Sequence, residues 1–275
     1  SLAARGLREV RVWHRDQLNG LLTKYQGVRS AFKGLLTVGD ILTRLNSLGG
    51  VLEPSEFEPV MMAHARRALG SERWVNFSEA GGENRQSVED VIIDLAAENH
   101  SARESVAVLQ EVIERSDSVL KPSIAPQSRH IVLTGQPGSG KSTITLFLTQ
   151  MYRVAFTAEE LLTPTLREVQ SGTLSALQRV GARCPRNRRW PIRVNLAKYA
   201  DELGPSGEKS LLRWMSERIS DRAEINILPN ALGRWIKNWP SLVILDGLDE
   251  VTAPEVRPRV LDEIRALVED SDVDD

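Results

Sequence analysis

The stretch "GQPGSGKST" combines closely spaced glycines with a lysine and hydroxyl side chains. Gly135, Gly140, Lys141 and Ser142 occupy the four defined positions of the pattern G-x-x-x-x-G-K-[ST]. Glycines allow a loop to fold so tightly that successive backbone N–H groups point at phosphate oxygens, an approach that a Cβ would obstruct. The pattern predicts a phosphate-binding loop formed by Gly135, Gln136, Pro137, Gly138, Ser139, Gly140, Lys141, Ser142 and Thr143.

Two side chains of this loop have distinct expected roles. Lys141 would reach the β- and γ-phosphates of a nucleotide, which makes it a candidate catalytic residue, and the Ser142 hydroxyl would ligate Mg²⁺. The N-terminus of a following helix would add its partial positive charge. The expected cofactors are therefore ATP or ADP together with Mg²⁺.

A second stretch, "LVILDGLDE" (242–250), carries the acidic residues that such a site needs. Four aliphatic residues lead into Asp246, as when a buried strand delivers a carboxylate to a phosphate-bound metal ion. Many ATPases place Glu directly after that Asp to orient the attacking water, but here Gly247 takes the position. Asp249 is the better candidate for positioning water because the Gly-Leu spacer can swing it beneath the γ-phosphate. Glu250 either shares that role or pairs with a basic partner.

These residues require particular elements around them. "HIVLT" (130–134) is predicted to be the strand before the loop, and "STITLFLTQMYRV" (142–154) the helix after it. "SLVILD" (241–246) is predicted to be a buried parallel strand with Asp246 at its carboxyl end, where ligands bind in open α/β sheets. The predicted buried face of the helix consists of Ile144, Phe147, Leu148 and Met151. The expected fold class is α/β, with the parallel sheet of a P-loop NTPase flanked by helices.

The N-terminal part of the chain is predicted to be a small, mainly helical domain, residues 1–70. Apolar residues recur at three- and four-residue steps in its first helix, a pattern typical of an amphipathic helix. The expected helices are Leu7–Val28, Val38–Leu48 and Pro54–Leu69, the last of them stopped by Gly70.

Residues 71–127 are predicted to be a connector, and residues 128–275 the nucleotide-binding domain. "VIIDL" (91–95) is interpreted as a strand because β-branched residues lead it. The other elements expected here are a short strand in "RWVNF", a turn at "AGGEN", a helix from Ala102 to Leu120 and a linker at "KPSIAPQS". The chain is expected to end with a helix from Pro258 to Val268 and a frayed acidic tail.

Composition restricts the class of protein. The chain has 275 residues with 41% hydrophobic and 26% charged residues, which fits a soluble globular protein. Its net charge of −2 gives no indication of a nucleic-acid partner. Cys184 is the only cysteine, which suits a reducing cytosol, and no apolar run approaches the ~20 residues of a membrane helix. A cytoplasmic protein without a membrane partner is expected.

Three other groups of residues have predicted roles. The arginines of "ARCPRNRR" (182–189) are interpreted as a solvated loop, with a contact to a neighbouring protomer's nucleotide or to nucleic acid as the alternative. The four histidines lack ligand spacing, so no metal site beyond Mg²⁺ is expected. Trp214 is predicted to lie in the core, and Trp235 and Trp239 to pack beneath the strand that ends at Asp246.

The two motifs together resemble the NACHT-domain NTPases of the STAND class, which include the animal NOD-like receptors and many bacterial relatives. In that family the Walker B strand ends in Asp, a small residue and a displaced acidic pair, as in Asp246, Gly247, Asp249 and Glu250. The segment "RRWPIRVNLAKYA" (188–200) is similar to the family's strand between the Walker A and Walker B motifs. The resemblance covers residues 130–265.

This resemblance implies a nucleotide-dependent switch in signal transduction that is ADP-bound at rest and forms oligomers through its NACHT domain when ATP-bound. Hydrolysis would be slow enough for the bound nucleotide to encode a state. "VEDVIIDLAAE" (88–98) is also similar to bacterial members with roles in defence. A full NACHT module continues to a strand with a sensor arginine and to further helical domains, whereas this chain ends at Asp275. Either the chain is a fragment, or its hydrolysis and assembly are incomplete in isolation.

Two alternative functions remain open at the level of sequence. One is a nucleotide-dependent scaffold that binds ATP but never cleaves it, and the other is a P-loop small-molecule kinase. A GTPase is disfavoured because the chain contains no N-K-x-D motif. The triggering ligand and the effector are not identified by any motif.

Overall fold

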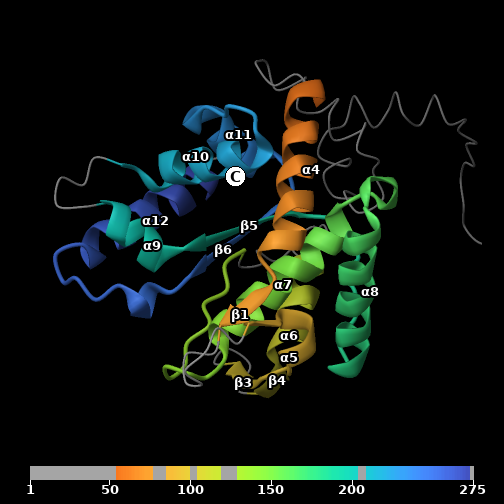
Figure 1. Ribbon diagram of the computed structural model, residues 1–275. Coiled ribbons are helices and arrows are strands. Elements are labelled where there is room, and N and C mark those ends of the chain that lie inside the picture. The colour runs from red at the N-terminus through yellow and green to blue at the C-terminus, as the bar shows by residue number, and fades with distance from the viewer. Residues whose placement is uncertain (1–53, 77–84, 100–103, 119–128, 204–208, 273–275) are drawn as a thin grey trace, which may run out of the picture.

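The computed structural model describes residues 54–76, 85–99, 104–118, 129–203 and 209–272 (Figure 1). The described part is mixed α/β, with helices on both sides of a small parallel sheet. Two predicted helices, Leu7–Val28 and Val38–Leu48, lie outside the described residues, as do the predicted turn (80–84) and the predicted linker (121–128). No helix of the described residues is long and apolar enough to cross a membrane.

The parallel sheet consists of β5 (Trp190–Asn195) and β6 (Ser241–Asp246), paired in register from Trp190 with Ser241 to Asn195 with Asp246. The prediction of a parallel strand at "SLVILD" is therefore confirmed. Parallel neighbours need a long crossover, and the chain supplies one with α9 (Leu196–Leu203), α10 (Leu211–Ala223) and α11 (Pro229–Asn238).

Side chains of β6 alternate between two hydrophobic clusters, as the two-residue period of a strand requires. Leu242 and Ile244 pack against the cluster around α7 (Lys141–Phe156) and α8 (Pro164–Arg179). Val243 and Leu245 pack against the larger cluster around α9, α10, α11 and α12 (Arg257–Asp272). Both faces of β6 thus contact apolar clusters, but residues 241–245 are half-buried, which is less than the predicted buried strand. Asp246 at its carboxyl end is only 8% exposed.

Helix α7 lies at the centre of the described structure and begins at the predicted phosphate-binding loop. Its predicted buried residues Ile144, Phe147, Leu148 and Met151 are all buried. Helix α8 follows after the short 3-10 helix η4 (Glu159–Leu161), with Pro164 in its first turn and the Thr163 hydroxyl accepting from the Leu166 N–H.

Helix α4 (Pro54–Ser71) confirms the predicted third helix and continues two residues past its expected end. Its residue Phe57 contacts the rings of Trp235 and Trp239, and Phe57, Val60, Met61 and Ala65 share the larger cluster with β5. Both tryptophans and Trp214 are buried, as predicted. The predicted domain of residues 1–70 includes α4, whose buried residues pack in the same cluster as the sheet.

The connector contains two small antiparallel pairs, β1 (Trp74–Asn76) with β2 (Arg85–Ser87) and β3 (Ala96–Asn99) with β4 (Glu104–Ala107). The strand predicted at "VIIDL" is wrong. Helix α5 (Val88–Val91) ends inside it and residues 92–95 are irregular. Val88 and Ile92, one helical turn apart, are both buried, so the period is helical. The predicted helix 102–120 is shorter, α6 (Val108–Ser118), because residues 104–107 pair with β3.

The predicted strand before the phosphate-binding loop is also wrong. Residues 129–136 form neither strand nor helix, and Ile131 and Val132 are 41% and 84% exposed. A strand needs a neighbouring backbone to pair with, and in the described part of the chain β6 pairs only with β5. The helix predicted at 258–268 is confirmed as the longer α12, and the acidic tail is helical as far as Asp272.

The arginine loop differs from its prediction at Arg189, which is 9% exposed. Its guanidinium donates to the Ser241 and Ser116 carbonyls at 3.1 and 2.5 Å and so ties α6 to the start of β6. Burial explains why the pKa of Arg189 is lowered. The prediction of a solvated side chain is therefore wrong for Arg189, which is buried and connects two elements of the fold.

Candidate phosphate-binding site

The glycine loop contains a turn in which the Ser139 N–H donates to the Gln136 carbonyl at 3.2 Å. Gly138 and Gly140 adopt left-handed φ angles of 76° and 84°, and Gly140 caps the N-terminus of α7. A Cβ added to Gly140 would stand 3.3 Å from the Leu95 Cδ1 atom, and one added to Gly135 would stand 3.0 Å from the Ser139 Oγ atom. Residues 135–139 are exposed. The loop is therefore open to a ligand at the positive end of a helix of 16 residues.

Lys141 links this loop to the acidic turn after β6. Its ammonium donates to the Gly135 and Gln136 carbonyls at 2.8 and 3.0 Å and lies 3.3 Å from the Asp249 carboxylate. The hydrogen bond from Lys141 is the main reason why the pKa of Asp249 is lowered, and the charge of Arg257 also contributes. Asp249 is thus held ionised at the loop although its side chain is 49% exposed.

Ser142 and Asp246 meet although they are 104 residues apart in the sequence. The Ser142 hydroxyl donates to the Asp246 Oδ1 atom at 3.2 Å, which joins the first turn of α7 to the end of β6. The other carboxylate oxygen, Oδ2, accepts from the Thr145 hydroxyl at 2.9 Å and from the Arg193 guanidinium at 2.5 Å. The predicted metal ligands are therefore direct neighbours.

The acidic turn is formed by Gly247 and the 3-10 helix η5 (Leu248–Glu250). Gly247 has a φ of 83°, and a Cβ there would stand 3.2 Å from the Glu250 Oε2 atom. Asp249 contacts the phosphate-binding loop through Lys141. The site network thus consists of two sets of contacts that adjoin at Lys141 and Ser142. Lys141 contacts Gly135, Gln136 and Asp249, and Ser142 contacts Asp246.

The donor set fits a small hard cation that is shared with a phosphate chain. Carboxylate and hydroxyl oxygens are ligands of Mg²⁺, which usually also takes water and substrate phosphate oxygens. Among the described residues no group of three or more His, Cys, Asp or Glu side chains could hold a metal ion. The residues Ser142 and Asp246 could therefore hold Mg²⁺ only with further oxygen ligands from a nucleotide and from water.

Sequence reasoning missed two residues of this network, Thr145 and Arg193. Thr145 lies three residues after Ser142, so the helical period places both hydroxyls on one face of α7. Arg193 is the single charged residue of the strand "WPIRVN" (190–195), next to the strand that ends at Asp246. A charge in the middle of an apolar strand was the available indication that Arg193 has a specific partner.

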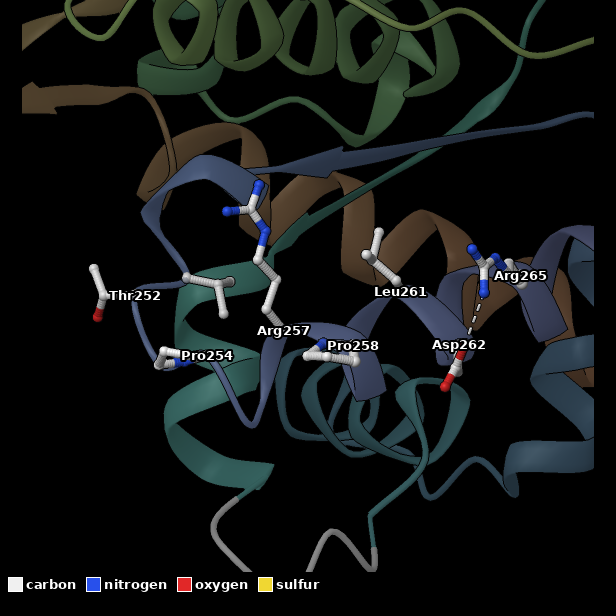
Figure 2. A pocket seen from close by; sticks show the side chains of 8 residues that line it. Thr252, Pro254, Arg257, Pro258, Leu261, Asp262 and Arg265 are labelled. Carbon is white, nitrogen blue, oxygen red and sulfur yellow. Dashed lines mark hydrogen bonds and ion pairs between the residues drawn. The ribbon is translucent and has the colours of Figure 1, made fainter.

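A separate open cavity of about 460 Å³ begins at Val251, just past the acidic turn, and is lined mainly by the start of α12 (Figure 2). Apolar side chains from Val251 to Leu261 form part of its wall. Asp262 and Arg265 pair with each other at 3.0 Å, whereas the Arg257 side chain extends away from them. None of the candidate phosphate-site residues lines this cavity.

Comparison of the chain with family models, curated proteins and solved structures finds no match.

Proposed function

We propose that this chain binds ATP or ADP together with Mg²⁺ at Gly135–Thr143 and acts as a slowly hydrolysing, cytoplasmic nucleotide switch of the NACHT type. The observation that carries the proposal is the contact between the Ser142 hydroxyl and the Asp246 carboxylate, 3.2 Å apart. A hydroxyl at the start of a helix and a carboxylate at the end of a strand are the two protein ligands that a phosphate-bound Mg²⁺ requires. Their meeting supports the resemblance noted in the sequence.

Each residue of the network has a role in this proposal. Backbone N–H groups between Gly135 and Thr143 would bind phosphate oxygens, and the Lys141 ammonium would move from the Gly135 and Gln136 carbonyls to the β- and γ-phosphates. Bound Mg²⁺ would neutralise charge on the phosphates. Asp249 would orient the attacking water, while Glu250 stays the alternative for that role.

The slow turnover follows from the position of the acidic residues. Gly247 stands where rapid ATPases place glutamate, and Asp249 is engaged by Lys141 in the structure. The switch would hold ADP at rest and self-associate through the same domain when ATP is bound, with a role in signalling and in bacterial defence as the resemblance implies.

The proposal is tested by nucleotide binding. Mass analysis of the denatured, purified protein should find co-bound ADP, and calorimetry should measure ATP and ADP binding in Mg²⁺. Lys141→Ala should weaken binding by ~1.5–3 kcal/mol, because it removes charge-assisted contacts. Lys198→Ala, at an exposed lysine on α9, is the matched control. Unchanged ATP affinity in Lys141→Ala, or no nucleotide binding by the native chain, would contradict the proposal.

Two further measurements separate the alternative functions. Single-turnover hydrolysis distinguishes an ATPase from a scaffold that binds ATP without cleaving it. Transfer of the γ-phosphate to a small-molecule acceptor, in a screen that follows labelled phosphate, would identify a kinase.

A further inference from the structure

Arg193 is placed to control the charge of the metal-binding carboxylate. It lies on β5, which pairs with the strand that ends at Asp246, and its side chain is 21% exposed. Its guanidinium lies 2.5 Å from the Asp246 Oδ2 atom, and Asp246 is itself 8% exposed. Opposite charges at this distance and burial interact more strongly than a pair in water. The negative charge of Asp246 is therefore largely neutralised by Arg193.

The Asp246 carboxylate is the anionic partner of Arg193 in the structure. The Nε atom of Arg193 is buried and has no hydrogen-bond partner among the described residues, so this side chain keeps unused donor capacity at the site.

The two oxygens of Asp246 are not equivalent. Oδ2 accepts from both Thr145 and Arg193, whereas Oδ1 accepts from Ser142, the other predicted metal ligand, and from no other described residue. Oδ1 is thus the carboxylate oxygen nearer to Ser142 and would be the one to share a cation with it. The Thr145 hydroxyl lies 2.9 Å from Asp246 Oδ2 and 3.0 Å from the Ser142 carbonyl, and its single proton is shared between these two acceptors. Thr145 is thus a second donor for Oδ2 if Arg193 is replaced by a neutral side chain.

We propose that Arg193 makes magnesium binding at Asp246 conditional on nucleotide: the neutralised carboxylate holds Mg²⁺ only when phosphate oxygens supply the missing negative charge. The inference rests on the proposed function, which supplies those oxygens. It makes Arg193 a positioning residue that prevents the metal from occupying the site alone. The small number of protein ligands agrees with this role, because the described residues include no group of three or more His, Cys, Asp or Glu side chains that could hold a metal ion.

The test uses Mn²⁺ as a paramagnetic substitute for Mg²⁺, titrated into the full chain without nucleotide and followed by electron paramagnetic resonance. Arg193→Met removes the charge and keeps an apolar stem, Arg193→Gln is a second neutral variant, and Arg193→Lys keeps the charge as the matched control. Removing one positive charge next to a divalent ion should lower the half-saturating Mn²⁺ concentration by about tenfold or more. Arg193→Lys should bind Mn²⁺ as weakly as the native chain.

A second arm measures the binding of a fluorescent ATP analogue at increasing Mg²⁺. The native chain should bind the analogue more tightly as Mg²⁺ rises, and the neutral variants should reach half of this gain at lower Mg²⁺. Adding Asp246→Asn to Arg193→Met should abolish the acquired Mn²⁺ binding, which locates the ion. A merely structural role would lower the melting temperature of the variants without changing either metal dependence.

Equal Mn²⁺ midpoints in the native chain and the neutral variants would overturn the inference, and so would an Arg193→Lys variant that behaves like Arg193→Met. Failure of the proposed function has a different signature: the native chain would bind no nucleotide at any Mg²⁺ concentration. The nucleotide-free Mn²⁺ titration would still decide whether Arg193 suppresses metal binding at Asp246.

Discussion

Asp249 and Lys141 form the contact through which the acidic turn reaches the phosphate-binding loop. Their charged groups lie 3.3 Å apart, and Asp249 is about half exposed. An ion pair of such exposure contributes little to stability because water screens it. In the proposed function, Asp249 would therefore act through the position of its carboxylate, beside the lysine that would contact the γ-phosphate.

At this scale we predict that Asp249→Asn leaves nucleotide affinity within about threefold of the native value but slows single-turnover hydrolysis by at least ~100-fold. The amide keeps the size of the side chain and loses the charge that orients water. Hydrolysis of labelled ATP and calorimetric affinity are measured on the same preparations. Glu250→Gln is the comparison variant, and normal turnover in Asp249→Asn with loss in Glu250→Gln would transfer the role to Glu250.

His64 on α4 shows how an element is attached to the sheet. Its Nδ1 atom accepts a hydrogen bond of 3.3 Å from the Trp190 indole N–H on β5, and its ring is buried. Burial is the main reason why the pKa of His64 is lowered to about 3, and the charges of Arg153 and Arg222 add to the effect. A neutral imidazole is therefore part of the packing between α4 and β5.

This attachment predicts a pH dependence of stability. Between about pH 6.5 and 3 the unfolded chain binds a proton at His64 that the folded chain excludes. The free energy of unfolding should then fall as pH decreases, by up to ~1.4 kcal/mol per pH unit from this group, with no contribution above pH 6.5. Urea unfolding at pH 7.5, 6.5, 5.5 and 4.5 measures it.

The control for this prediction is His64→Gln, whose amide oxygen can still accept from Trp190. The variant should lose less stability than the native chain between pH 6.5 and 4.5, by on the order of 2 kcal/mol. Parallel curves for the two proteins would show that His64 is protonated in the folded state or accessible to water.

The segment before the glycine loop allows a direct test of its exposure. Val132 is 84% exposed, so Val132→Ala should change the free energy of unfolding by less than ~0.5 kcal/mol. Ile144→Ala, in the buried face of α7, should cost ~2–5 kcal/mol. Denaturant unfolding of both variants decides the point. If Val132→Ala instead lowered the free energy of unfolding by as much as Ile144→Ala, residues 130–134 would pair as a buried strand in solution.

At the scale of the whole molecule, sequence patterns correctly predicted the helix and the strand that carry the candidate site. The helical period of Ile144, Phe147, Leu148 and Met151 and the aliphatic run before Asp246 identified α7 and β6. The contact of Ser142 with Asp246 was implied by their positions at the ends of these elements.

The incorrect predictions concern segments whose structure depends on contacts with residues far away in the sequence. "HIVLT" (130–134) has strand propensity, but propensity produces a strand only where a neighbour offers N–H and C=O groups. "VIIDL" (91–95) is a short apolar run whose period is ambiguous, and its residues Ile92 and Leu95 pack in the cluster around α7 and α8 without forming a strand. Arg193 was missed because its role arises from pairing between β5 and β6, which one-dimensional patterns do not contain.

The left-handed turn at Gly247 restricts how the proposed switch could acquire faster hydrolysis. A side chain there would meet the Glu250 carboxylate at 3.2 Å on a backbone that L-residues rarely adopt. Inserting glutamate next to Asp246 would consequently reshape the corner that carries Asp249, and one acidic group would be gained at the expense of another. Variants with rapid hydrolysis would therefore need substitutions at several neighbouring positions together. The hydrolysis rate of the proposed switch would thus depend on the backbone conformation of this turn.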